Sequence, residues 1–221
     1  MVRAHNDHRI IETPEDVDTG LRALKRRCPH MRRAHALAGD PPLRRDSGGF
    51  EGLARIVVGQ QVSIASANAI WARVAAGVTP FTPQRMAQLD EAALQAFGLS
   101  RPKIATLSKL ARHLVDGGDW LPELAQVSDD DVREKLVALP GIGPWTADVY
   151  LLFCLGRPDS FAPGDLALQV AAQWLMGLDG RPDGRALEAI AERWRPWRGV
   201  AARMLWAYYG VVKRSGTAAP V

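Results

Sequence analysis

Apolar residues recur at helical spacing along most of the chain, and no segment shows the alternation typical of a half-buried strand. The spacing, together with the turn residues between the apolar runs, predicts helices over 14–27, 50–60, 64–74, 91–97, 101–115, 128–139, 144–155, 165–176, 185–194 and 199–213. We therefore predict an all-α fold.

Short polar residues and glycines mark the expected ends of these helices. A side chain that can accept a hydrogen bond from the first free amides of a helix favours an N-cap. The residues predicted to cap helices in this way are Thr13, Asp90, Ser100, Ser128 and Asp165. The segment Gly39-Asp40-Pro41-Pro42 is the clearest linker, so the residues before it are expected to pack separately from those that follow it.

The most informative segment covers residues 136–150 and reads LVALPGIGPWTADVY. An apolar helical run stops at Leu139-Pro140, two glycines predict a tight turn, and Pro144 is suited to the first turn of a new helix. Gly141 and Gly143 allow positive φ angles and leave the backbone of the turn uncovered. Free amides beside a helix N-terminus can bind a phosphate. The segment therefore predicts a helix-hairpin-helix that binds a nucleic-acid backbone, with an ordinary helix–loop–helix corner as the alternative.

About twenty residues after the hairpin, the segment DSFAPGDL places Asp165 at the start of an apolar helix. Aspartate is among the best N-caps, so a purely structural role would account for it. The alternative is a carboxylate that stabilises positive charge developing on a sugar and orients a water molecule. The two roles are compatible.

Composition narrows the functional classes. The 221 residues carry a formal net charge of +4, which suits a polyanionic partner without requiring one. Two cysteines, Cys28 and Cys154, cannot form a disulfide framework or hold a four-thiolate iron–sulfur cluster. The first nine residues are too polar for a signal peptide, and no apolar run reaches membrane-spanning length. We expect a cytoplasmic protein, associated with the nucleoid if it is bacterial, and no membrane partner.

The motif LPGIGPWTA followed by FAPGD resembles the helix-hairpin-helix (HhH-GPD) superfamily of DNA base-excision glycosylases. The segments VGQQVS at 58–63 and RPWR at 195–198 point more closely to its 3-methyladenine DNA glycosylase II branch. The four motifs occur in the order of that branch, between about Phe50 and Lys213.

The resemblance implies a two-lobed helical fold with the active site in the cleft between the lobes, in a compact form without an N-terminal sheet domain. The implied domains are 1–48, N-terminal helices packing with the C-terminal lobe; 49–150, a central lobe with the hairpin pair at about 128–155; 151–214, a C-terminal lobe carrying the catalytic aspartate; and 215–221, a tail.

The resemblance also assigns the active-site residues. Asp165 matches the catalytic aspartate, and Trp145 and Trp206 match aromatic positions of the base pocket. Trp145 stands where lyase-competent members carry a lysine, which implies an enzyme without lyase activity. Val149 and Leu166 occupy pocket positions where some relatives have aromatic residues, so the range of accepted bases is open.

The residues expected to contact DNA are Gln60, Gln61, Gly141, Gly143, Thr146, Arg101 and Lys103. Gln61 matches the position that fills the gap left by a flipped nucleotide, while Gln60 could equally be a buried amide that fixes a helix junction. The resemblance further implies that the main-chain carbonyls of Val137, Leu139 and Ile142 would hold Na⁺ or K⁺, with no other cofactor.

The expected function is the hydrolysis of the N-glycosidic bond of alkylated purines, chiefly 3-methyladenine and with it 7-methylguanine, in double-stranded DNA by a monomer that flips the base. One alternative is a glycosylase for another lesion, such as hypoxanthine or an etheno adduct. The other is a non-catalytic module that binds damaged DNA.

Overall fold

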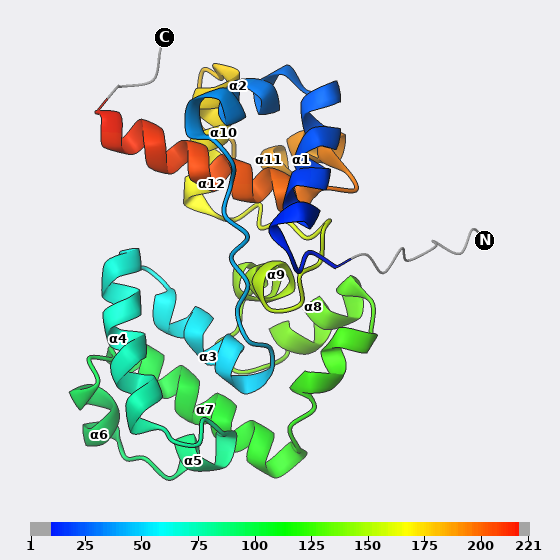
Figure 1. Cartoon of the computed structure of the whole chain (residues 1–221). Helices are drawn as coiled ribbons and strands as arrows, with labels where there is room; N and C mark the ends of the chain where they lie inside the picture. Colours follow the sequence, from blue (N-terminus) through cyan, green and yellow to red (C-terminus); the bar gives the residue numbers. More distant parts are fainter. Residues whose placement is uncertain (1–9, 217–221) are drawn as a thin grey trace. The chain divides into compact units, whose positions relative to one another are not determined.

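The computed structural model of the chain describes residues 10–216, and every regular element in that range is a helix (Figure 1). The sequence interpretations that fall on residues 1–9 and 217–221 lie outside the described residues. The chain divides into two units. Unit 1 contains the residues up to Arg45 and those from Leu151 onward, and unit 2 contains Asp46–Tyr150. The division lies within α9 (Pro144–Phe153).

Unit 1 is built around its C-terminal helix. Its helices, apart from the end of α9, are α1 (Pro14–Arg27), α2 (Pro29–Ala38), α10 (Leu166–Met176), α11 (Gly184–Ala191), the 3₁₀ turn η2 (Glu192–Trp194) and α12 (Arg198–Ser215). Helix α12 packs against α1, α2 and α10, and residues 198–205 at its start are all buried. Its burial on several sides makes α12 the core element of this unit.

Unit 2 is arranged around α7 (Arg101–Gly117), which packs against three other helices of the unit. Its buried face is formed by Ile104, Leu107, Leu110, Ala111 and Leu114, at the spacing of one helical stripe. The other elements are α3 (Gly49–Gly59), α4 (Ile64–Gly77), α5 (Pro83–Ala87), α6 (Glu91–Ala96), the 3₁₀ helix η1 (Leu121–Gln126) and α8 (Asp129–Val137).

The all-α prediction is confirmed, and the differences concern short or weakly amphipathic elements. Helix α2 was not predicted because only Met31 and Ala34 are buried on it, which leaves almost no apolar stripe to detect. The five-residue α5 and the 3₁₀ helix η1 were also missed, and α4 continues to Gly77 rather than ending at 74.

Among the predicted caps, Thr13, Asp90, Ser128 and Asp165 accept a hydrogen bond from the first turn of their helices. At Thr13 the bond is reciprocal, because Asp16 accepts from the Thr13 amide. The prediction for Ser100 is wrong in detail. Ser100 occupies the N-cap position of α7, but its side chain makes no capping hydrogen bond.

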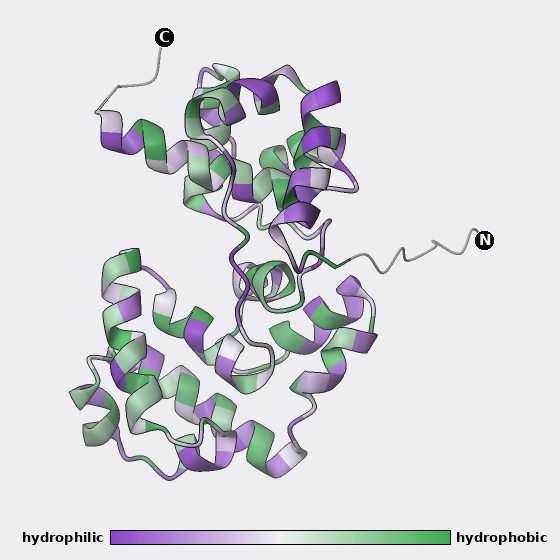
Figure 2. Cartoon of the chain, in the orientation of Figure 1, coloured by the Kyte–Doolittle hydropathy of each residue, from purple (hydrophilic) through white to green (hydrophobic). Residues whose placement is uncertain are grey.

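Helix α9 differs from the amphipathic helices around it. Figure 2 shows α9 as mostly hydrophobic, whereas hydrophilic residues cover much of α1. Every residue from Thr146 to Phe153 is buried, which explains why this helix needs apolar residues on all its faces. No helix in the part of the chain that the structure describes is long and apolar enough to span a membrane.

The start of α12 lies unusually close to the segment that precedes Asp165. The Gly199 amide donates to the Pro158 carbonyl over 2.8 Å. A Cβ atom at position 199 would lie 2.8 Å from that carbonyl oxygen and 3.0 Å from the Arg157 carbonyl oxygen. Only glycine therefore allows α12 to approach this segment so closely.

We expect Gly199→Ala to lower the free energy of unfolding by about 1–3 kcal/mol, since the new methyl group meets backbone atoms that cannot move aside. Gly210→Ala is the matched control in the same helix. Its nearest neighbour would be the flexible end of Arg214 at 3.4 Å, so this change should stabilise by about 1 kcal/mol. Chemical denaturation of the two variants measures both effects, and equal stability would contradict the close-packing explanation.

Candidate functional site

Asp165 is held at the first turn of α10 by its own side chain and by the loop before it. Its Oδ1 atom accepts a hydrogen bond from the Leu168 amide at 3.0 Å, which is the N-cap interaction. The Asp165 amide donates to the Ala162 carbonyl at 3.0 Å, and Gln169 donates to the Pro163 carbonyl at 3.0 Å. The carboxylate is therefore fixed by local structure, as the sequence predicted for a cap.

A second donor reaches the same carboxylate from α12. The indole nitrogen Nε1 of Trp206 donates to Asp165 Oδ1 at 3.1 Å. The Trp206 ring is half-buried and lies 5.5 Å from the ring of Phe153, centroid to centroid. Two N–H groups from different helices thus converge on one oxygen, which orients the carboxylate plane. The sequence assigned both residues to the site but gave no signal for their direct contact.

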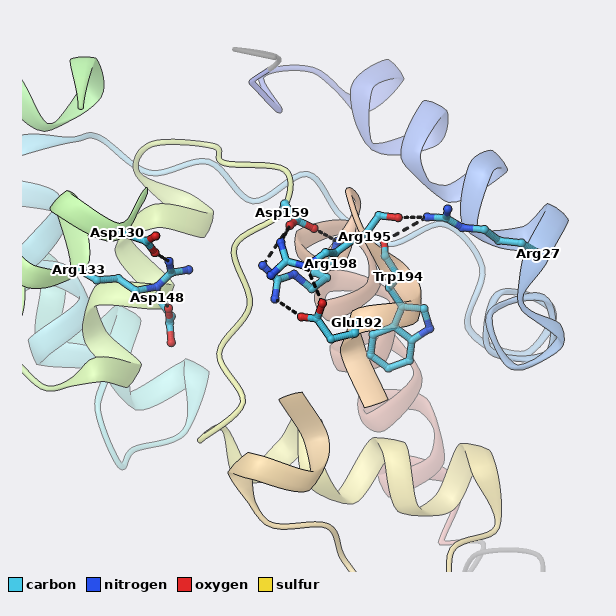
Figure 3. A network of polar contacts seen from close by, with 9 residues as sticks. All are labelled: Arg27, Asp130, Arg133, Asp148, Asp159, Glu192, Trp194, Arg195 and Arg198. Carbon is cyan, nitrogen blue, oxygen red and sulfur yellow. Dashed lines mark hydrogen bonds and ion pairs between the residues drawn. The ribbon is translucent and has the colours of Figure 1, made fainter. Parts of the chain in front are cut away.

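The loop that leads to Asp165 is anchored at its beginning by ion pairs (Figure 3). Asp159 Oδ2 lies 2.5 Å from Arg195 and 3.0 Å from Arg198, and Asp159 Oδ1 accepts from the Arg198 amide at 3.2 Å. Glu192 bonds the same two arginines at 2.8 and 3.1 Å. The hydrogen bond from Arg195, with the charges of both arginines, lowers the pKa of Glu192.

This cluster explains the RPWR segment at 195–198, which the sequence analysis recognised only as a motif. Its two arginines connect the start of α12 to the loop before Asp165. Because α12 also carries Trp206, one helix fixes the loop at Asp159 and contacts Asp165 at the loop's end.

In unit 2, α8 and α9 form the predicted hairpin. The turn is closed by the Ile142 amide donating to the Leu139 carbonyl at 3.2 Å. Gly141 has φ +79°, whereas Gly143 does not use the positive φ that a glycine allows. A Cβ atom at Gly141 would meet the Thr106 side chain at 2.6 Å, whereas one at Gly143 would meet no atom within 4 Å. Gly143 is therefore partly exposed, with open space where a side chain would lie, which leaves room for a phosphate.

An ion pair braces the two hairpin helices. Arg133 of α8 bonds the buried Asp148 of α9 at 2.8 Å and the exposed Asp130 at 3.2 Å (Figure 3). Burial alone would lower the pKa of Arg133, but the hydrogen bond and charge of Asp148, with further nearby aspartates, raise it. This ion pair was not predicted from the sequence.

The glutamines between α3 and α4 differ in their surroundings. Gln60 is half-buried, and its amide nitrogen donates to the hydroxyl of Thr146 at 2.9 Å. Thr146 is 2% exposed, so its hydroxyl serves the interior and not a surface contact. Gln61 is exposed and has φ +55°, a conformation that is uncommon for residues other than glycine. Gln60 thus fits the structural interpretation, and Gln61 is the one presented at the surface.

The two basic residues at the start of α7 also differ in their surroundings. The Lys103 ammonium donates to the Val58 carbonyl at 2.7 Å, and burial lowers the pKa of Lys103. Arg101 is exposed. A cavity of about 180 Å³ lies beside them, lined by Gln60, Gln61, Ser100, Pro102, Lys103 and Thr106.

The remaining predicted pocket residues have distinct environments. Trp145 is half-buried in the first turn of α9, and Val149 is buried one turn later. Leu166, next to Asp165, is 57% exposed. Among the described residues, no group of three or more His, Cys, Asp or Glu side chains is arranged to hold a metal ion.

The family model of HhH-GPD superfamily base excision DNA repair proteins matches residues 54–196, which include the hairpin, Asp165 and the first residues of RPWR. This chain belongs to that superfamily.

Two solved structures of superfamily proteins share the fold over almost their whole length. Mag1, a 3-methyladenine DNA glycosylase of Schizosaccharomyces pombe solved with abasic DNA, has a TM-score of 0.78 at 26% identity, covering 92% of this chain and 99% of that one. A DNA-3-methyladenine glycosidase of Bacillus halodurans has a TM-score of 0.71 at 31% identity, covering 93% and 94%.

Sequence comparison gives the same grouping. DNA-3-methyladenine glycosylase 1 of Schizosaccharomyces pombe is 31% identical over 164 residues, covering 71% of each chain. Other curated relatives are much longer. The chain spans only 43% of a Bacillus subtilis relative and 38% of a Mycobacterium tuberculosis relative.

We expect Gly141→Ala to destabilise unit 2 by about 2 kcal/mol, because alanine is strained at a positive φ and its methyl group would collide with Thr106. Gly143→Ala is the control within the same turn, and it should change stability by less than about 0.5 kcal/mol. Thermal and chemical denaturation compare the two variants. Equal losses of stability would show that the turn does not depend on the left-handed glycine.

Proposed function

We propose that the protein is a DNA glycosylase that hydrolyses the N-glycosidic bond of alkylated purines, chiefly 3-methyladenine, in double-stranded DNA. The observation that carries this proposal is the convergence of the Trp206 indole N–H and the Leu168 amide on Asp165 Oδ1. This arrangement places the aromatic ring of Trp206 beside an oriented carboxylate. A protein that only bound DNA would need neither.

In this mechanism Asp165 acts on the sugar. As the bond between the base and C1′ breaks, its electron pair leaves with the base and positive charge develops on the sugar. A fixed carboxylate stabilises that charge and can orient the water whose oxygen then bonds to C1′. An alkylated purine is already cationic, so it departs as a neutral base and needs little help from an acid.

The aromatic residues recognise the extruded base. A cationic purine is attracted to the face of an indole ring by cation–π interaction as well as by stacking. The ring of Trp206, supported by Phe153, presents such a face beside Asp165, and Trp145 occupies the second aromatic position that the family resemblance assigns to the pocket. Val149 and Leu166 provide aliphatic surface in place of further aromatic rings.

Unit 2 supplies the contacts that hold DNA. The open space beside Gly143, at the start of α9, is suited to a phosphate, and the exposed Gln61 would fill the gap left by the base, as the family resemblance implies. The exposed Arg101 is a further candidate for contact with the phosphate backbone of DNA. We do not assign DNA contact to the buried Thr146 side chain.

The carbonyls of Val137, Leu139 and Ile142 would hold a monovalent cation in the hairpin turn. Backbone carbonyl oxygens are the donors that K⁺ and Na⁺ accept in proteins. The Leu139 carbonyl already accepts from the Ile142 amide, and its second lone pair would serve the ion. Such an ion would stiffen the turn and add positive charge near a bound phosphate.

We further propose that the enzyme has no lyase activity and works as a monomer. A lyase attacks the sugar with an amine and forms a Schiff base. Position 145 is tryptophan, which has no such amine. The product is then an intact abasic site.

Asp165→Asn tests the catalytic assignment directly. Asparagine caps helices as well as aspartate does, so the fold should be preserved while the charge is lost. We expect release of 3-methyladenine from methylated duplex DNA to fall by about 10²-fold or more, with binding to abasic DNA largely retained.

The assay separates released bases by chromatography and examines the DNA strand as well. Wild-type protein should leave the strand unbroken, and borohydride should trap no covalent adduct. Full activity of the variant would show that Asp165 caps α10 and takes no part in the reaction. Release of hypoxanthine or an etheno base alone would assign the enzyme to another lesion, and release of none would favour the non-catalytic binding module.

Trp206→Phe tests the hydrogen bond between the two residues. Phenylalanine keeps a ring against Phe153 but removes the N–H donor, so Asp165 loses one of its orienting partners. We expect single-turnover base release to slow by about 10–100-fold, as for a misplaced catalytic group. Trp174→Phe is the control, because Trp174 stacks on Tyr209 in the same unit. Equal rates in both variants would show that the indole N–H does not matter.

A further inference from the structure

Three arginines of unit 1 contact Phe153, two at its ring and one at its backbone carbonyl. The guanidinium carbons of Arg44 and Arg203 lie 5.0 and 5.1 Å from the ring centroid, and Arg45 donates to the Phe153 carbonyl at 3.1 Å. None of the three forms an ion pair with a carboxylate of residues 10–216. Like charges gathered without a counter-charge repel one another, so this cluster favours an anion.

Two of the arginines have structural roles that account for them. Arg45 donates to the Phe153 and Cys154 carbonyls, and the buried Arg203 donates to the Leu152 carbonyl at 2.8 Å. These carbonyls lie at the C-terminus of α9, where cations are favourable. Burial, with the charges of Arg45 and Arg44, lowers the pKa of Arg203 to about 10.

Arg44 has no such role. It is exposed, and its side chain makes no hydrogen bond or ion pair within the described residues beyond its approach to the Phe153 ring. Nevertheless its backbone has φ +45°, which is strained for arginine. The neighbouring residues impose this conformation, because Arg203 bonds the Leu43 carbonyl at 2.9 Å and Arg45 is tied to α9. The fold therefore constrains the backbone at Arg44, and the guanidinium of this residue lies over the Phe153 ring.

That place adjoins the catalytic residues. The Phe153 ring under Arg44 lies 5.5 Å from the Trp206 ring, and Trp206 donates to Asp165. A nucleotide whose base stacks on Trp206 and whose sugar meets Asp165 carries its phosphates on that same sugar. We propose that Arg44 binds a backbone phosphate flanking the extruded nucleotide, an inference that rests on the proposed function.

The chemistry of the reaction favours such a partner. An uncompensated guanidinium near the site would oppose both a cationic base and the positive charge that develops on the sugar. A phosphate on Arg44 neutralises this charge when DNA binds, and arginine can hold a phosphate through two parallel hydrogen bonds. Arg44 is thus a binding residue for the lesion strand, distinct from the hairpin.

Arg44→Gly tests this proposal, because glycine accepts the positive φ and should preserve or raise the melting temperature. The probes are a duplex with a tetrahydrofuran abasic-site analogue and the same duplex undamaged, titrated by fluorescence anisotropy at several KCl concentrations. For the abasic duplex we expect the slope of log K against log [salt] to become shallower by about 0.9, the loss of one phosphate contact. The dissociation constant should rise several-fold, with a smaller change for the undamaged duplex.

Arg44→Lys should restore most of the slope, since it keeps the charge. The matched control is Arg22→Gln, which removes an exposed arginine of unit 1 that already has a carboxylate partner, Asp18, at 3.3 Å. An unchanged slope in Arg44→Gly, or equal losses on both duplexes, would overturn the proposal. If the proposed function itself is wrong, the wild-type protein will release no base and will bind the two duplexes with equal affinity.

Discussion

Two N–H groups donate hydrogen bonds to the same oxygen of Asp165, and the packing of unit 1 brings both donors to it. The Leu168 amide comes from the helix that Asp165 itself caps, and the Trp206 indole comes from α12. The first contact is local and needs only α10. The second requires that α12 lie at a fixed distance from the loop before Asp165, so the carboxylate is oriented only when the whole unit is folded.

Close packing and ion pairing secure this distance together. Gly199 allows the backbone of α12 to touch the Pro158 carbonyl, and Asp159 binds both arginines of the RPWR segment. Gly199 and the ion pairs of Asp159 thus hold the N-terminal end of α12 against this loop. Trp206 contacts Asp165 about two turns further along the helix. The loop from Asp159 to Asp165 is therefore held at both its ends by contacts with α12 and the turn before it.

In each unit, polar residues that lie close together divide into residues that bond inside the protein and one that is exposed. Gln60 and Gln61 are neighbours, yet one bonds Thr146 inside unit 2 and the other is exposed. Arg44, Arg45 and Arg203 show the same division around Phe153, where two arginines satisfy helix carbonyls and the third is presented outward. In each group, the exposed member whose side chain makes no internal hydrogen bond is the candidate for contact with DNA.

The sequence by itself determined the all-α fold, most helix boundaries, the hairpin and the capping position of Asp165. These features depend on residues close together in the chain, where helical periodicity and turn chemistry act directly. It did not predict α2, whose apolar stripe is too small. Only the tertiary structure decided the contacts between distant residues: Trp206 with Asp165, Asp159 with Arg195 and Arg198, and Arg203 with the Leu43 carbonyl. Such contacts depend on how helices pack, which no local pattern specifies.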